Sequence, residues 1–428
     1  MSEPNEPKKN DSGRARLRLA EPHLAAALAS GAPEAPAGAE RASTGPLTAG
    51  HFMTDFYPGL MPGLWPEVGK NLALSEAAAT TLPAIGSALM VLQPFIGLWA
   101  DRLGARRRFI VTGLVVAACL YPLLLLMPSY ALTVACLVPA ALGIATFHPV
   151  AAGAAKRGGA AALSLFVGLG TAGYVTGQLA GPAVVQAFGA EWLILLAIPG
   201  LAAALWIQGT ERPGARPPPP SLQLLWGDLC ARWRPVAVLW AIVALRAFAI
   251  MAFVRLLPFF LDERRGLAPL PRSIPGTILI LACAIGGLFA AWLMRRLGAR
   301  FSILLSFALG MPLLAVGAWA VSLGGGALGA WDLASYGLTF VGGAVMGSTV
   351  PVNIALAQRL LPRSAALASG VMMGLGWSVG GVLVPLGSLL GGAMGNTAHA
   401  VAVLVAATAL SGALALLLPR DDDAAAEG

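Results

Sequence analysis

The chain has 428 residues, of which 57% are hydrophobic and 11% are charged. A soluble domain carries about 25% charged residues, so this composition excludes an ordinary soluble enzyme, a nucleic-acid-binding protein and a disordered chain. A polytopic all-α membrane protein remains. The formal net charge of +8 would also suit a nucleic acid, and the placement of the basic residues decides that question below.

Residues 1–46 precede the first apolar stretch and are rich in proline, alanine and charged residues. They contain no apolar core of the length that a signal peptide requires. We therefore predict a disordered cytoplasmic tail here, although the arginines from Arg14 to Arg18 would also suit contact with anionic lipid.

A membrane-spanning helix needs roughly 20 mostly apolar residues, and the chain offers twelve such stretches. They lie at 48–68, 77–100, 108–127, 131–155, 161–187, 191–209, 235–259, 274–294, 301–321, 332–357, 365–390 and 398–419. The links between them are too short for a soluble domain.

Four consecutive prolines lie in the segment 211–234, which predicts a stiff cytoplasmic linker. The sequence therefore predicts two six-helix bundles, over 47–210 and 235–419, and a short cytoplasmic tail over 420–428.

The basic residues indicate the orientation, because Lys and Arg concentrate in cytoplasmic loops. Most of the 28 Lys and Arg residues fall on one side if both termini are cytoplasmic. The positive charge is thus explained by topology, and we predict a lipid bilayer and no nucleic acid among the partners.

Three short motifs occur twice, in the same order in each half. They are Arg102–Arg106 with Arg296–Arg300, Pro149–Arg157 with Pro351–Arg359, and Gly168–Gly170 with Gly374–Gly376. Parallel six-helix repeats describe one major transporter architecture, so the sequence predicts two pseudo-symmetric bundles.

Four stretches resemble a known family. Residues 97–108 (GLWADRLGARRR) resemble the loop motif of the major facilitator superfamily. The stretches HFMTD (51–55), Gln93-Pro94 and Phe147-His148-Pro149 are similar to those of fosmidomycin-resistance-type drug efflux permeases. The second half departs from the pattern, since Arg295 stands where the first loop has an acidic residue.

The resemblance implies a secondary transporter that works by alternating access and is driven by a proton gradient, with no cofactor. It implies a monomer in the bacterial inner membrane that exports a small drug-like or anionic compound in exchange for protons. Proton-coupled uptake of a metabolite is the alternative.

By these boundaries, Asp55 is the only acidic residue well inside a predicted span. A charge inside the membrane is costly, so its presence indicates a function. Burial favours its neutral form, and His51 lies four residues earlier on the same helical face. We predict that the two residues couple transport to protons. Alternatively, His51 only forms a hydrogen bond near the interface.

Arg246 lies near the middle of the seventh span, and a buried arginine needs an anionic partner. It would hold an anionic substrate, such as the phosphonates that the resemblance implies. Alternatively it neutralises Asp55, since the first and seventh spans are related by the repeat. Glu67 and Arg255 lie near the outer ends of these two spans and are predicted to pair as a periplasmic gate, unless each reaches the interface separately.

The loop motif contains Gly97, Asp101, Arg102, Gly104, Arg106 and Arg107. Gly104 suits its tight turn. The resemblance implies that Asp101 meets the start of the eleventh span near Ser364 and Ala365 and latches the cytoplasmic side. Gly168, Gly177, Gly181 and Pro182 resemble an antiporter motif, although close helix packing also explains them.

Further polar and aromatic residues are candidates for the substrate cavity: Gln93, His148, Gln178, Asn353, Tyr57 and Trp377. For each, an interhelical hydrogen bond or core packing is the alternative. The four cysteines have no metal-type spacing, so we predict no metal site. No nucleophile constellation supports an enzyme, and no G-x-x-x-x-G-K-[ST] loop supports a nucleotide-driven pump.

Overall fold

The computed structural model describes residues 44–155, 160–210, 227, 229–361 and 370–419. Across these residues the chain forms helices joined by short turns. Each predicted span that falls within them has a helical counterpart. The two predicted tails, most of the predicted linker, and Ser364 and Ala365 lie outside the described residues.

The first half contains six helical segments, several of them in two pieces. They are α2 (Thr44–Gly59) with α3 (Trp65–Asn71), α4 (Glu76–Leu89) continued by η1 (Met90–Leu92) and α5 (Gln93–Leu103), α6 (Arg106–Leu120) with η2 (Tyr121–Leu126), α7 (Tyr130–Ala155), α8 (Ala160–Phe188), and η4 (Ala190–Leu196) with α9 (Ala197–Thr210).

The second half repeats this arrangement. It contains α11 (Trp233–Glu263), α12 (Pro269–Leu288), α13 (Ala290–Leu305) with η5 (Ser306–Gly310) and α14 (Met311–Val321), α15 (Ala330–Gly347) with α16 (Thr349–Leu360), η7 (Val371–Leu375) with α18 (Gly376–Val382) and α19 (Val384–Met394), and α20 (Thr397–Ala409) with η8 (Leu410–Leu417).

Ten helical stretches within the described residues are long and apolar enough to cross a membrane. The other two predicted spans correspond to α2 and α8. The helix α2 ends at Gly59, nine residues before the predicted end of the first span at 68, because Pro62 and Gly63 follow it before α3 begins at Trp65. The helix α8 is 29 residues long.

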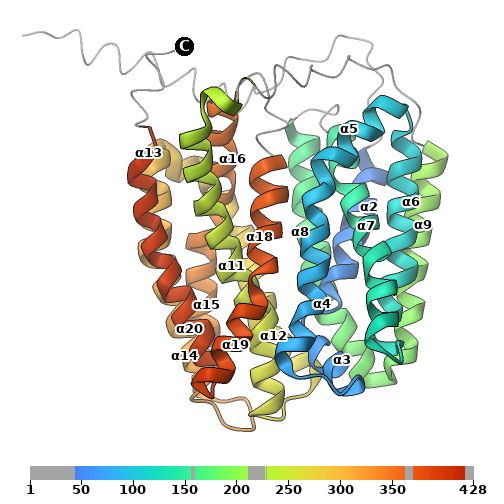
Figure 1. The fold of residues 1–428 in the computed structure, drawn as a ribbon, viewed down its shortest axis with the longest axis vertical. Coiled ribbons are helices and arrows are strands. Elements are labelled where there is room, and N and C mark those ends of the chain that lie inside the picture. Colours follow the sequence, from blue (N-terminus) through green and yellow to red (C-terminus); the bar gives the residue numbers. More distant parts are fainter. Residues whose placement is uncertain (1–43, 156–159, 211–226, 228, 362–369, 420–428) are drawn as a thin grey trace, which may run out of the picture.

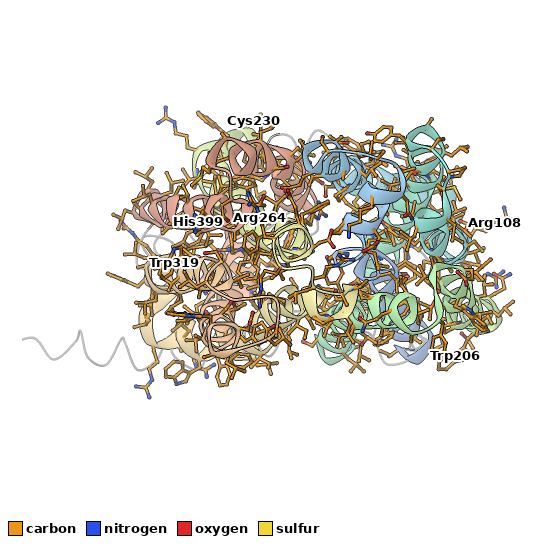
Figure 2. The ribbon with its side chains drawn as sticks, turned by 90° about the horizontal axis from the view of Figure 1, so that it is seen from below. Arg108, Trp206, Cys230, Arg264, Trp319 and His399 are labelled. Carbon is orange, nitrogen blue, oxygen red and sulfur yellow. The ribbon has the colours of Figure 1, made fainter. Side chains whose placement is uncertain are left out.

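The apolar residues form two separate cores, one within each half. The first core runs from Leu47 to Ile207 and the second from Val236 to Leu418, and Phe259 of the second half joins the first core. Figure 1 shows the two halves side by side, and Figure 2 shows the same division from below. The fold is therefore the predicted all-α architecture of twelve membrane helices in two six-helix bundles.

The glycine of the repeated R-L-G-A-R motif has a positive φ in both halves. Gly104 has a φ of 67° and Gly298 has a φ of 75°, a range that favours glycine. Gly104 lies in the turn between α5 and α6, and Gly298 forms a kink inside α13. The sequence repeat thus places a glycine where each half needs a positive φ.

The helices α2 and α8 pack against each other through a row of glycines on α8. A Cβ atom at Gly173, Gly177 or Gly181 would lie 2.0, 2.2 or 2.7 Å from the carbonyl oxygen of Phe52, Phe56 or Leu60. Such small residues let helix backbones approach closely in a membrane. Packing therefore accounts for Gly177 and Gly181, whereas Gly168 has open space around its Cβ position.

We expect Gly173→Ala to destabilise the protein, because its new methyl group would overlap the Phe52 carbonyl oxygen. Overpacking of this kind costs about 1–3 kcal/mol. The measurement is the thermal midpoint of the purified protein in detergent, followed by size-exclusion chromatography.

Gly168→Ala is the matched control, since it adds the same methyl group to the same helix at a position where no described residue lies within 4 Å. Equal midpoints for the two variants would contradict the tight α2–α8 contact.

Candidate functional site

Three polar side chains meet inside the first bundle. The helix α2 contributes His51 and Asp55, and α7 contributes His148. Asp55 Oδ1 lies 2.8 Å from His148 Nε2, and Asp55 Oδ2 lies 3.3 Å from His51 Nε2. The side chains are 8% (His51), 21% (Asp55) and 25% (His148) exposed, so the group is largely buried, with Asp55 and His148 partly exposed.

The backbone orients both imidazoles of this His51–Asp55–His148 cluster. Nδ1 of His51 lies 2.7 Å from the carbonyl oxygen of Phe166 on α8, and Nδ1 of His148 lies 2.9 Å from that of Ile144. A carbonyl oxygen only accepts hydrogen bonds, so each Nδ1 carries the proton and donates it. The Phe166 ring also stacks on the His51 ring, with their centroids 4.0 Å apart.

The row of glycines on α8 makes room for the cluster. A Cβ atom at Gly170 would lie 2.3 Å from Cε1 of His51 and 2.7 Å from Oδ2 of Asp55. Only a glycine therefore lets α8 come close enough for Phe166 to reach His51.

This arrangement leaves the cluster short of positive charge. With Nδ1 protonated, each neutral imidazole presents the lone pair of Nε2 toward a carboxylate oxygen, which also carries lone pairs. Each of the two contacts is attractive only when a proton or another cation lies between the atoms. The cluster is thus built to take up cations.

The predicted His51–Asp55 contact forms, and His148 joins it although the sequence suggested His148 only as a cavity residue. Asp55 and His148 are 93 residues apart in the chain. Their pairing depends on how α7 packs against α2, and no local spacing reports that.

Arg246 of α11 is a fully buried cation, 1% exposed. Among the described residues, its Nε and Nη1 atoms have no hydrogen-bond partner. No ion pair among the described residues joins it to Asp55, whose contacts are with the two histidines. The alternative that Arg246 neutralises Asp55 is therefore not realised in this structure.

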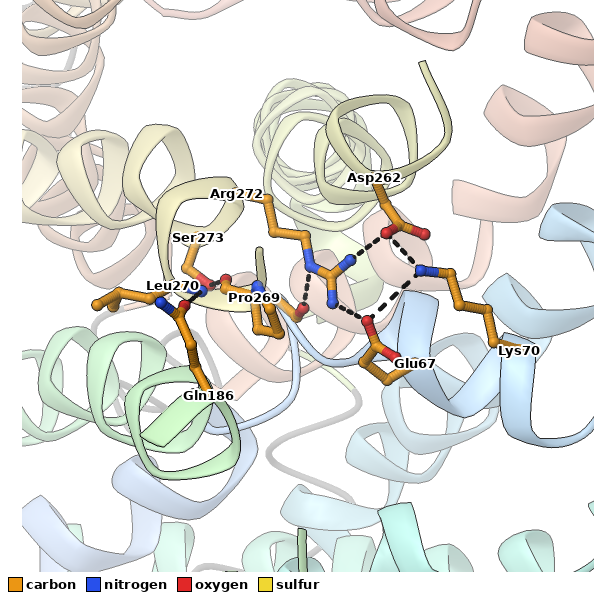
Figure 3. Close-up of polar contacts among 9 residues, drawn as sticks. Glu67, Lys70, Gln186, Asp262, Pro269, Leu270, Arg272 and Ser273 are labelled. Atoms are coloured by element: carbon orange, nitrogen blue, oxygen red, sulfur yellow. Dashed lines mark hydrogen bonds and ion pairs between the residues drawn. The ribbon is translucent and has the colours of Figure 1, made fainter. Parts of the chain in front are cut away.

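At the end of the molecule where α3 lies, an ion-pair network joins the two halves (Figure 3). Arg272 of α12 is fully buried and donates to Glu67 of α3, to Asp262 of α11 (2.5 Å) and to the carbonyl oxygen of Gly63 (2.9 Å). Lys70 lies 2.6 Å from the same Asp262 oxygen and 3.6 Å from Glu67. This is the end predicted to face outward.

The predicted pair of Glu67 and Arg255 is wrong for this structure. Glu67 contacts Arg272 and Lys70 instead. Arg255 reaches across to α4, where its Nη1 donates to Ser87 Oγ (2.9 Å) and to the carbonyl oxygen of Pro83 (3.2 Å). The pair was predicted because both residues lie near the outer ends of their spans. In the structure the two side chains contact different neighbours and do not meet.

Of the remaining cavity candidates, two lie where the halves meet. Gln178 is fully buried and accepts a hydrogen bond from Thr277 of the other half at 3.3 Å. Gln93 Oε1 would lie 3.7 Å from a Cβ atom at Gly374 of η7.

Each of the other three candidates lies inside a single bundle, Tyr57 in the first and Asn353 and Trp377 in the second. Tyr57 is fully buried and donates to the Leu196 carbonyl oxygen at 3.0 Å, so it packs inside the first bundle. Trp377 packs against the second core. Asn353 is 1% exposed, and both polar atoms of its side chain lack a partner.

The loop motif lies at the opposite end from α3, between α5 and α6 (Figure 1). Gly97 faces Pro149 of α7, at 3.2 Å from its Cβ position. Arg102 and Gly104 are exposed, and Arg106 and Arg107 are half-buried around the turn. The side chain of Asp101 and residues 364 and 365 lie outside the described part, so the latch stays a prediction. Pro182 is buried and packs near Gly63.

Several charged residues were not predicted as site residues, because the sequence places them in loops. Arg272, Asp262 and Lys70 belong to the ion-pair network that joins the two halves. Arg265 forms a buried ion pair with Asp332 at 2.6 Å within the second half. The only signal available was their position just beyond the outer ends of predicted spans.

Known proteins share both the family and the fold. The family model of the Major Facilitator Superfamily matches residues 47–385. The uncharacterized MFS-type transporter YfnC of Bacillus subtilis (strain 168) is 25% identical over 388 residues, which cover 87% of this chain and 91% of that protein.

Solved structures agree at the level of the fold. A bacterial homolog to the human lysosomal transporter Spinster, inward-facing and unoccupied, has a TM-score of 0.66 at 18% identity and covers 90% of this chain and 95% of its own. The nucleoside transporter NupG has a TM-score of 0.70 at 12% identity, with coverages of 87% and 98%.

We expect Arg272→Ala to open the outer end, because it leaves the carboxylates of Glu67 and Asp262 near each other with only Lys70 between them. Removing one partner of a buried ion pair costs about 3–5 kcal/mol. Spin labels on cysteines placed at the exposed residues Ala73 and Ala393, one in each half, would report a shift to longer distances.

Lys70→Ala is the control, because the Lys70 side chain is 56% exposed and surface pairs contribute only about 0–1 kcal/mol. An unchanged distance distribution in folded Arg272→Ala protein would contradict a gating role for the network.

Proposed function

The chain belongs to the major facilitator superfamily and is a multi-pass secondary transporter of a small molecule, and from this premise we propose that it exports an anionic or drug-like compound in exchange for protons. The observation that carries the proposal is the His51–Asp55–His148 cluster, whose two contacts each need a cation to be attractive. We also propose that it acts as a monomer in the bacterial inner membrane, with both termini in the cytoplasm.

The cluster supports proton coupling through its position as well as its chemistry. Ionisable residues inside the membrane mark ion and proton pathways. The Asp55 and His148 side chains are partly exposed, at 21% and 25%, so protons can reach them. Because three groups share the bound protons, their uptake and release belong to the cluster and not to a single residue.

Arg246 supports an anionic substrate. Its guanidinium is buried in the second half with two nitrogen atoms unpartnered, and a buried charge without a partner is strongly unfavourable. A carboxylate or phosphonate would supply both the charge and the acceptors, since the planar fork of arginine matches such groups.

Alternating access requires that the halves separate at one end at a time. The outer ends are joined by Arg272 and Lys70 (Figure 3), and Thr397 of α20 also donates to Glu76 of α4 at 2.9 Å. These contacts must break before the outer end opens. We propose that the network is the outer gate, in place of the pair of Glu67 and Arg255.

Uptake of a metabolite is the second candidate. The export direction rests on the resemblance to drug efflux permeases, because Gly177 and Gly181 have a packing role against α2 that applies to either direction. Proteoliposomes with an imposed pH gradient separate the two: export requires the compound and protons to move in opposite directions, and uptake requires the same direction.

We expect Asp55→Asn to abolish proton movement driven by substrate, because the amide keeps the shape of the carboxyl group but carries no charge. The assay is proton flux in proteoliposomes presented with a panel of phosphonates and hydrophobic drugs. His399→Gln is the control, since His399 contacts Ser322 of the second half and lies outside the cluster. Normal proton flux in Asp55→Asn would overturn the coupling role.

We expect Arg246→Met to weaken binding of anionic substrates roughly 10- to 150-fold, because hydrogen bonds to charged groups contribute about 1.5–3 kcal/mol. Methionine fills similar space without the charge, and Arg246→Lys should retain part of the affinity. Neutral compounds of similar size should bind both variants as well as the parent. Equal loss for neutral and anionic compounds would indicate a purely structural role for Arg246.

A further inference from the structure

We propose that His51, Asp55 and His148 form a binding site for a divalent transition-metal ion of the zinc type. The inference replaces the expectation of no metal site, because packing of α7 against α2 brings together ligands that no sequence spacing reveals. It goes beyond the proposed transport function and does not rest on it. It concerns what the cluster can hold at equilibrium, in the absence of substrate or gradient.

The three side chains offer metal ligands at compatible distances. One ligand atom from each residue lies within 4.8 Å of the others. The Nε2 atom of His51 and the nearer Asp55 oxygen are 3.3 Å apart, and the corresponding distance for His148 is 2.8 Å. Two ligands bound to tetrahedral zinc at 2.0–2.2 Å lie about 3.3–3.5 Å apart, so small side-chain adjustments would complete the coordination.

Both imidazoles are already oriented as metal ligands usually are. A histidine that binds a metal through one ring nitrogen donates the other N–H to a carbonyl or carboxylate. Nδ1 of His51 faces the Phe166 carbonyl oxygen and Nδ1 of His148 faces the Ile144 carbonyl oxygen. Each Nε2 is therefore left with a free lone pair, and both lone pairs point to Asp55.

The ligand types select the class of ion. Imidazole suits zinc, copper, nickel and iron, whereas magnesium and calcium prefer sites made of oxygen ligands. Two imidazoles and one carboxylate also leave a fourth position open, as in zinc sites with a bound water. Asp55 and His148 are 21% and 25% exposed, so the cluster is not sealed off from a diffusing ion.

A single dication would satisfy both contacts at once. It would replace the protons that otherwise lie between the Nε2 atoms and the carboxylate, because ligands must be deprotonated to bind a metal. Metal and protons therefore compete for the same three side chains, and bound metal would block any proton uptake there.

The test uses Co²⁺ as a visible substitute for zinc with the full-length protein in detergent, purified through a tag without histidine. We expect one Co²⁺ per chain, a tetrahedral absorption band, displacement by Zn²⁺ and no displacement by excess Mg²⁺. Asp55→Asn and His148→Gln should each lose the band while eluting as folded protein.

A matched double variant, His23→Gln with His399→Gln, removes the other two of the four histidines and should keep the band. Loss of the band in this variant, or no binding by the parent protein, would overturn the proposal. Should a cluster variant fail to fold, X-ray absorption of zinc bound to the parent protein decides: a signal from two imidazoles supports the site, and any other ligand set contradicts it.

The outcome is separable from that of the proposed function. Cobalt binding by the parent protein together with normal proton flux in Asp55→Asn would support the metal site and contradict proton coupling. Loss of proton flux in Asp55→Asn without any metal binding by the parent protein would support proton coupling and contradict the metal site.

Discussion

The close approach of α8 to α2 is the contact on which the candidate site depends. Glycines at 170, 173, 177 and 181 bring the two backbones together along about three turns of α8. This proximity delivers the Phe166 carbonyl oxygen to His51 and leaves just enough space at Gly170 for the imidazole. A side chain at any of these positions would push α8 away, and His51 would lose the group that fixes its protonated nitrogen.

The buried arginines differ in how far carboxylates or other acceptors of the protein compensate their positive charge. Arg265 is paired with Asp332 inside the second half, and Arg272 is paired with carboxylates from both halves. Arg255 relies on a hydroxyl and a carbonyl oxygen. Two nitrogen atoms of Arg246 have no hydrogen-bond partner within the part of the chain that the structure describes. Since an uncompensated buried charge is strongly unfavourable, the least balanced residue is the one best suited to meet an external anion.

Much of the fold follows from local properties that the sequence displays. Apolar length predicted the helices, and the R-L-G-A-R repeat predicted two related halves, in each of which the glycine of the motif, Gly104 or Gly298, has a positive φ. The contact of His51 with Asp55 was also predictable, because a spacing of four residues places both on one face of a helix.

The contacts between distant helices were not predictable in this way. His148 reaches Asp55 only after α7 packs beside α2, and Arg272 reaches Glu67 only after the halves meet. Depth in the membrane can be counted from the sequence, and on that basis Glu67 seemed matched to Arg255. The direction in which a side chain leaves its helix, in contrast, depends on how all the helices pack. In the packed structure Glu67 contacts Arg272, and Arg255 contacts Ser87.

One consequence follows from the fact that a single bundle supplies all three residues of the cluster. When two bundles rock as rigid bodies, the distances inside each bundle stay the same, so the geometry that holds a cation is identical at both ends of the cycle. Rocking would change which compartment the cation can reach, and not how tightly the side chains grip it. Under the proposed function, the direction of transport would then be set by the ion gradient across the membrane and not by a change in the cluster itself.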